Sequence, residues 1–246
     1  SAIGLIITYT KRLHTILTRL NKRRIELLAP ARNLQCGIAA IDHGADAVYI
    51  GAPRFGARAA VGNSIEDIKQ LCDYAHTFMA RVYVTVNTIL YENELEDIRL
   101  MLKELSGIGV DAILVQDMSI LRMDTGDMEL HASTQTDNRT PEKVSWLKDM
   151  GFSRVVLARE LSLEEISVIH QSVPDVELEA FVHGAMCISY SGRCLLSDYL
   201  DGRSSNRGAC VQSCRWRYEV RALNATNGQS EWLPIEEDAR GSFIFN

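Results

Sequence analysis

Three stretches of the chain share one pattern, and this pattern decides the fold. They are HGADAVYIG (residues 43–51), GIGVDAILVQ (residues 107–116) and DMGFSRVVLA (residues 149–158). In each stretch a glycine ends an amphipathic segment, and a polar residue then precedes a short apolar run. A glycine at a helix terminus followed by a run of this length is typical of the step from a helix into a buried parallel strand.

The same alternation extends along most of the chain. Apolar runs predict seven strands, at residues 25–31, 47–53, 82–87, 112–117, 128–133, 154–161 and 177–184. Apolar residues at helical spacing predict helices over residues 63–79, 93–109, 140–151 and 162–174. Asn93, Thr140 and Ser162 are the expected N-caps of the last three helices. Strands that alternate with helices predict a parallel α/β sheet.

Alternation alone is compatible with an open doubly wound sheet or with a closed barrel. No G-x-G-x-x-G follows the first strand, and polar residues follow nearly every strand, where barrels build their sites. We therefore predict a TIM-like (β/α) barrel over residues 25–246, preceded by a basic N-terminal extension at residues 1–24. A barrel has eight strands and seven are found, so we expect it to be incomplete at the C-terminus, with a Cys-rich loop segment after strand seven.

Charge and hydropathy narrow the function classes. A net charge of −6 and a pI near 5.6 disfavour a protein that binds polyanions over its whole surface. Basic residues are nevertheless grouped in residues 11–24 and 193–221, where they either contact phosphates or form solvated faces. No stretch reaches the roughly 18 consecutive apolar residues that a membrane span needs, so we predict no membrane association.

The side chains that follow the strands predict where a ligand binds, because strand ends meet at the mouth of a barrel. They are Arg32, Asn33, Arg54, Arg58, Asn87, Gln116, Asp117, Ser133, Gln135, Arg159, Glu160, His183 and Cys187. This mixture suits an anionic or planar hydrogen-bonding ligand better than glycoside chemistry. We expect Asn87, Gln135, Arg159 and His183 to bind substrate, and His183, Arg159 and Glu160 are the catalytic candidates. The alternative is structural: Arg159 pairs with Glu160, and the amides satisfy loop backbone.

Four of the six cysteines are grouped late in the chain, at Cys187, Cys194, Cys210 and Cys214. A domain with an ample core rarely carries disulfide bonds so close together in sequence, so we expect free thiols and a reducing, cytoplasmic compartment. Four soft thiolates suit an iron-sulfur cluster or zinc, although the spacing between the first two is wide for a zinc knuckle. The alternative is thiols that pack or stay unpaired. Cys36 and Cys72 are expected in the core.

Hydrolase motifs give little further guidance. HExxH, GxSxG and the P-loop pattern are absent. His183 lies four residues before Cys187, so a Cys/His nucleophilic pair is conceivable, because a thiolate needs a nearby cation at neutral pH. Proximity in sequence is weak support for such a pair.

The four late cysteines lie in two long stretches, EAFVHGAMCISYSGRCLLS (residues 179–197) and RGACVQSCRWRYEV (residues 207–220). Shorter blocks are ELLAPA, GADAVYIG, VYVTVN and LARELSLEEI. The two long stretches resemble the defining motif of the collagenase-like peptidase family U32, and the shorter ones are similar to its other blocks. The order of the cysteine blocks looks most like the tRNA hydroxylation branch. One departure is Arg32, which stands where the family usually has the glycine of APAG.

The resemblance implies a TIM-like domain and several activities. The family is named for collagenase-type proteolysis, and other members make 5-hydroxyuridine in tRNA or 5-hydroxycytidine in rRNA. In those members a 4Fe-4S cluster is held by four cysteines, which correspond here to Cys187, Cys194, Cys210 and Cys214, and prephenate is implicated as hydroxyl source. We expect RNA base hydroxylation with RNA as partner. The alternatives are peptide hydrolysis, with His183 and a cysteine or a bound metal activating water, and a zinc-stabilised RNA-binding module.

Overall fold

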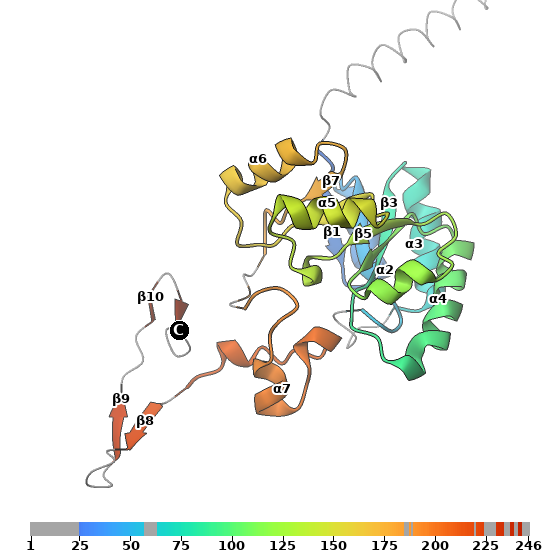
Figure 1. Cartoon of the computed structure of the whole chain (residues 1–246). Helices are drawn as coiled ribbons and strands as arrows, with labels where there is room; N and C mark the ends of the chain where they lie inside the picture. The colour runs from blue at the N-terminus through green and yellow to red at the C-terminus, as the bar shows by residue number, and fades with distance from the viewer. Residues whose placement is uncertain are drawn as a thin grey trace, which may run out of the picture.

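A computed structural model describes residues 25–56, 63–184, 187, 189–218, 220–223, 230–233, 237–238 and 241–242. Its centre is a curled parallel sheet in which each strand pairs with the next along the chain (Figure 1). The strands are β1 (Leu28–Ala31), β2 (Ala47–Gly51), β3 (Arg81–Val86), β4 (Ala112–Val115), β5 (Glu129–Ala132), β6 (Arg154–Val156) and β7 (Glu177–Glu179). The seven predicted strands and the barrel-like α/β fold are thereby confirmed, and the described ranges hold no eighth parallel strand.

The repeated sequence step has a backbone role. The polar residue before the strand donates its N–H to the preceding strand or its lead-in: Asp46 to Leu27 O (2.9 Å), Asp111 to Val82 O (3.1 Å) and Ser153 to Leu130 O (3.0 Å). The glycine two residues earlier has a positive φ in all three steps. The pattern therefore recurs because each strand starts its ladder in the same way.

In the part of the chain that the structure describes, five helices flank the sheet: α2 (Leu34–Asp42), α3 (Ile65–Thr77), α4 (Leu95–Gly107), α5 (Pro141–Asp149) and α6 (Leu163–Ser172). The expected caps are right at Thr140 and Ser162, whose hydroxyls accept from the backbone of Lys143 and Glu165. The expectation for Asn93 is wrong, because a 3-10 turn, η2 (Glu92–Glu94), precedes α4. Short turns also follow two strands, η3 (Met118–Arg122) and η4 (Thr134–Thr136).

Apolar side chains pack on both faces of the sheet. The larger cluster lies between sheet and helices and includes Val84, Leu102 and Ile113, all without exposed area. The inner cluster is small: Ala47, Tyr83, Ala112, Leu114 and Val156. Near the amino ends of the strands, polar groups complete the interior.

Those polar groups centre on Arg154, whose side chain is 7% exposed. Its guanidinium pairs with Glu26 at 2.6 Å and with Glu177 at 2.6 Å, and it lies 3.7 Å from Glu179. Burial raises the pKa of Glu179 to about 7. Burial, together with the charge of Arg154, lowers the pKa of His131 to about 4.

Residues 187–218 form what we call the thiol segment. It is mostly irregular, as expected, with one short helix, α7 (Leu196–Asp201), and two 3-10 turns, η5 (Ser205–Arg207) and η6 (Ser213–Arg215). Two antiparallel pairs follow, β8 (Val220–Leu223) with β9 (Ser230–Leu233) and β10 (Glu237–Asp238) with β11 (Gly241–Ser242). The predicted extension at residues 1–24 lies outside the described residues. Within them, no helix has the length and apolarity that crossing a bilayer requires.

Candidate functional site

The thiol segment docks on the carboxyl ends of β5 and β6 through a buried serine. The hydroxyl of Ser191 lies 3.3 Å from that of Thr134 and accepts from Arg159 Nη1 at 3.4 Å. The next residue, Gly192, has φ +75°, and a Cβ there would stand 2.0 Å from the carbonyl oxygen of Gln135. Only glycine fits this contact, so the segment approaches the strand ends as closely as backbone allows.

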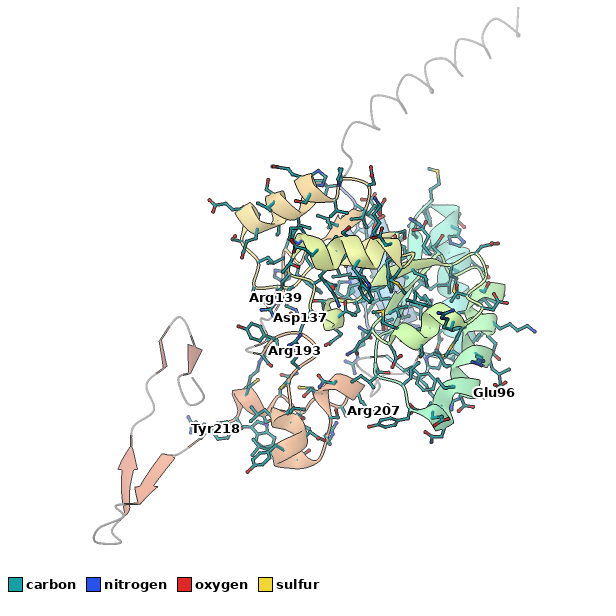
Figure 2. All side chains as sticks on the ribbon, in the orientation of Figure 1. Glu96, Asp137, Arg139, Arg193, Arg207 and Tyr218 are labelled. Atoms are coloured by element: carbon teal, nitrogen blue, oxygen red, sulfur yellow. The ribbon has the colours of Figure 1, made fainter. Side chains whose placement is uncertain are left out.

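A charged clasp lies beside this contact (Figure 2). Asp137, with a side chain 8% exposed, pairs with Arg139 at 2.8 Å and with Arg193 at 3.1 Å. The Arg139 guanidinium also lies 4.2 Å from the ring centre of Tyr190. Because Tyr190 and Arg193 lie on either side of Gly192 in the sequence, the clasp holds the stretch of backbone that leads to Cys194.

A second anchor lies farther along the segment. Arg207 donates to the carbonyl of Ile89 at 2.6 Å and to the carboxylate of Glu94 at 2.7 and 3.1 Å. Its guanidinium lies 4.0 Å from the ring centre of Tyr91. The Arg207 hydrogen bond is also the main reason why the pKa of Glu94 is below its usual range. The loop after β3 is thereby tied to the end of η5.

Inside the segment, hydrogen bonds replace an apolar core. The buried Ser197 hydroxyl donates to Arg203 O at 2.6 Å and accepts from the Val211 N–H at 3.1 Å. Tyr218 donates its hydroxyl to Ser213 O at 2.7 Å. These bonds hold together the loops that carry the last two cysteines.

The four late cysteines gather in this segment as free thiols. Cys187 and Cys210 are exposed, and Cys194 and Cys214 are half-buried. Burial raises the pKa of Cys214, and the neighbouring thiols of Cys187, Cys210 and Cys194 raise it further. The sulfur of Cys214 therefore lies within electrostatic range of the other three thiols. Among the described residues, no three or more His, Cys, Asp or Glu side chains are arranged as ligands of one metal ion.

This donor set fits a soft metal centre by its chemistry. Four thiols are the donor set that iron-sulfur clusters and structural zinc share. The Gln212 N–H also points at Cys210 Sγ at 3.3 Å, the kind of bond that stabilises a thiolate. Of the other two cysteines, Cys72 is buried, and burial raises its pKa to about 12. Cys36 is exposed, so its expected place in the core is wrong: it lies on the outer side of α2.

The expected substrate-binding residues do not all lie at one surface. Asn87 is 8% exposed and donates to the Ser133 hydroxyl at 3.1 Å, bridging the ends of β3 and β5. Arg159 contacts Ser191 and lies 5.1 Å from the ring centre of Phe181, and it forms no ion pair with Glu160 within the described ranges. Glu160 and His183 are exposed. Their catalytic roles stay predictions.

The remaining strand-end residues divide between structural roles and open positions. Asn33 caps α2 by accepting from Cys36 N at 3.0 Å, and Arg54 pairs with Asp97 at 2.8 Å. Asp117 accepts from the Leu90 and Ser119 N–H groups. Arg32 is exposed after β1, and Arg58 lies outside the described residues.

A depression of about 350 Å³ opens beside the ends of β3, β4 and β5. It is lined by Ile89, Gln116, Asp117, Met118, Gln135, Thr136, Lys143 and Trp146. Gln135 is the one predicted substrate-binding residue among them. The prediction from sequence missed Lys143 and Trp146 because they lie on α5, away from any strand end. The signal that could have found them is a tryptophan on the polar side of an amphipathic helix.

Comparison with known proteins assigns the chain to a family. Residues 32–246 match the model of peptidase family U32. The chain belongs to this family. It is 51% identical over 201 residues to the 23S rRNA 5-hydroxycytidine C2501 synthase of Escherichia coli, covering 82% of this chain and 31% of the relative. It is 41% identical over 225 residues to the tRNA hydroxylation protein P1 of Bacillus subtilis, covering 90% and 53%.

A relative named for another activity also matches. The chain is 31% identical over 215 residues to the collagenase of Porphyromonas gingivalis, covering 82% of this chain and 52% of that one. The chain thus spans about a third to a half of the length of these curated relatives. Among solved structures, the U32 peptidase Mk0906 aligns with a TM-score of 0.54 at 18% identity over 64% of this chain and 68% of that one, which supports the fold.

Proposed function

We propose that this U32 chain belongs to an enzyme that hydroxylates an RNA base and holds a 4Fe-4S cluster on Cys187, Cys194, Cys210 and Cys214. The observation that carries the proposal is the set of four free thiols grouped in one segment, which docks on the carboxyl ends of a barrel-like sheet. Carboxyl ends are where α/β barrels place their chemistry. Identities of 51% and 41% to proteins named for rRNA and tRNA hydroxylation support the substrate class.

The chain's own residues take distinct parts in this proposal. When bound, the cluster supplies redox or Lewis-acid chemistry next to the strand ends. Arg159 and the exposed His183 bind substrate beside it, and the imidazole of His183 is the candidate group for proton transfer. Prephenate, which the resemblance to the RNA-hydroxylating members implies as hydroxyl source, has carboxylates that suit the arginines of this region. The higher identity to the rRNA synthase favours a cytidine of 23S rRNA as the target.

Metal analysis is the first test. Protein purified without oxygen should contain about four iron and four sulfide per chain and be coloured. Alanine at Cys187, Cys194, Cys210 or Cys214 should remove most of the iron, whereas Cys36→Ala, at an exposed thiol elsewhere, should not. Zinc without iron or sulfide would instead indicate a zinc-stabilised RNA-binding module.

Nucleoside analysis is the second test. In cells that lack the native gene, 5-hydroxycytidine in 23S rRNA should return with the wild-type enzyme but not with Cys194→Ala. His183→Ala should reduce the product by an order of magnitude or more if the histidine transfers a proton. Unchanged modification in the Cys194→Ala strain would contradict the proposal.

Peptide hydrolysis is the second candidate, favoured by the 31% identity to a collagenase. It requires that His183, with a cysteine or a bound metal, activates water. Gelatin cleavage that His183→Ala and Cys187→Ala both abolish would support it. Cleavage that persists in both variants would rule out this mechanism.

A further inference from the structure

The depression beside β3–β5 contains an aromatic platform with a cation next to it. Trp146 is 44% exposed, and Lys143 Nζ lies 5.0 Å from its ring centre. Lys148, one turn farther along α5, pairs with Asp175 at 3.2 Å. Lys143 has no acidic partner within the described ranges. The pair therefore offers a flat apolar ring and an uncompensated positive charge at one edge of the depression.

The lining of the depression also includes a hydrogen-bonding amide. Gln116 Oε1 is buried and finds no hydrogen-bond partner among the residues that the structure describes. Its neighbour Asp117 already accepts from two backbone N–H groups, those of Leu90 and Ser119. A buried polar atom without a partner is uncommon and calls for one, so the amide of Gln116 is the group here that is free to receive a donor.

The depression also adjoins the thiol segment. Gly192 packs on the carbonyl of Gln135, and a Cβ at Gly192 would lie 3.5 Å from Gln116 Nε2. Both glutamines line the depression, and Gly192 lies two residues before Cys194. A molecule seated in the depression is therefore a neighbour of the segment that carries the proposed cluster ligands.

We propose that this depression binds one unpaired base of a single-stranded RNA. Trp146 stacks on the base, Gln116 accepts a hydrogen bond from the base edge, and Lys143 contacts an adjacent phosphate. Unpaired bases are recognised in this way, by an aromatic face together with polar groups at the base edge. The inference rests on the proposed function, since it names the substrate subsite of the same enzyme.

Binding of a fluorescently labelled single-stranded oligoribonucleotide to the full chain tests the platform. Trp146→Ala should weaken binding about tenfold or more, and Trp146→Phe should restore much of the loss. The matched control is Phe78→Ala: Phe78 is 56% exposed but follows α3 at the amino ends of the strands. Equal losses for Trp146→Ala and Phe78→Ala would overturn the assignment.

The salt dependence of the same binding tests Lys143. Lys143→Ala should reduce the slope of log affinity against log salt by about 0.7, the value for one phosphate contact of a single strand. Lys148→Ala, on the same helix, should leave the slope unchanged. Gln116→Leu should lower the preference between bases more than it lowers overall affinity. An unchanged slope and an unchanged base preference would overturn these two assignments.

Two further readouts separate this inference from the proposed function. Iron content should be unaffected by Trp146→Ala, and a loss of iron would mean that Trp146 serves the thiol segment instead. Wild-type binding and full hydroxylation by Trp146→Ala would overturn the subsite while the proposed function stands. If the wild type binds a gelatin-derived peptide but no RNA, and Trp146→Ala weakens the binding of this peptide, both the RNA subsite and the proposed function fail.

Discussion

The barrel-like domain and the thiol segment are filled by opposite kinds of side chain. In the barrel most fully buried positions are apolar, as at Leu102 and Ile113. In the thiol segment the buried positions among the described residues are Ser191, Ser197 and Ser213, while Tyr199 is 86% exposed. The barrel is thus stabilised by hydrophobic burial and the segment by hydrogen bonds and ion pairs. We infer that the segment's order depends on its anchors and on the proposed cofactor.

The largest expected effect follows from the barrel core. Ile113→Ala in β4 removes a side chain without exposed area and should lower the free energy of unfolding by about 2–5 kcal/mol. Ser197→Ala, the matched change in the thiol segment, should leave the urea midpoint of the barrel nearly unchanged. A similar loss for both variants would mean that the two regions unfold as one unit.

The Arg154 network predicts a second effect, which depends on pH. An unfolded glutamate titrates near 4.3, so Glu179, with a pKa of about 7, binds its proton more tightly in the native state. The free energy of unfolding therefore falls as pH rises through this window. An unfolded histidine titrates near 6.5, whereas native His131 has a pKa of about 4. The contribution of His131 to the free energy of unfolding therefore falls as the pH decreases from about 6.5 to about 4. Glu179 and His131 thus change the free energy of unfolding with pH in opposite directions. The two changes nearly cancel in the pH range where both groups titrate.

Substitutions should reveal each slope. Glu179→Gln should raise the free energy of unfolding above pH 7 by up to about 3 kcal/mol. In this variant only the effect of His131 remains, so the free energy of unfolding should fall as the pH is lowered. His131→Phe should leave stability that falls as pH rises from about 4.5 to 7. Urea titrations at several pH values measure both. Parallel pH profiles for the two variants and the wild type would contradict the assignment.

A smaller effect on stability is expected at the Asp137 clasp. Asparagine tolerates the positive φ of this position, so Asp137→Asn removes the charge that holds Arg139 and Arg193 with little backbone strain. The barrel should lose no more than about 1–2 kcal/mol. Iron content should fall several-fold, and proteolysis within residues 187–218 should accelerate. Unchanged iron and unchanged proteolysis would show that the clasp does not position the segment.

The smallest effect is expected at the Arg207 anchor, which is partly solvated. Glu94→Gln should change global stability by about 1 kcal/mol or less and raise the cleavage rate near Arg207 a few-fold. The control is Glu96→Gln, at an exposed carboxylate two residues later, in the first turn of α4 (Figure 2). Glu96 has no ion-pair partner within the described ranges. Equal cleavage rates in both variants would refute the anchor.

Prediction from sequence succeeded where the signal is local. The strands and most helices follow from the spacing of apolar residues, and the caps Thr140 and Ser162 follow from hydrogen bonds within one turn. Asn93 was assigned wrongly because a 3-10 turn and the helix after it share the same composition. Cys36 was assigned wrongly because a cysteine on a short helix does not show which face is buried.

The features of the candidate site also divide into those that follow from local sequence and those that follow from the fold. The sequence by itself determined the order of strands and helices and the grouping of four thiols, because both depend on residues near one another in the chain. Only the tertiary structure decided that Asp137 holds Arg193, that Arg159 meets Ser191 rather than Glu160, and that Trp146 and Gln116 line one depression. These pairs join segments 30 or more residues apart, and their contacts follow from how the curled sheet brings its strand ends together, which no local pattern encodes.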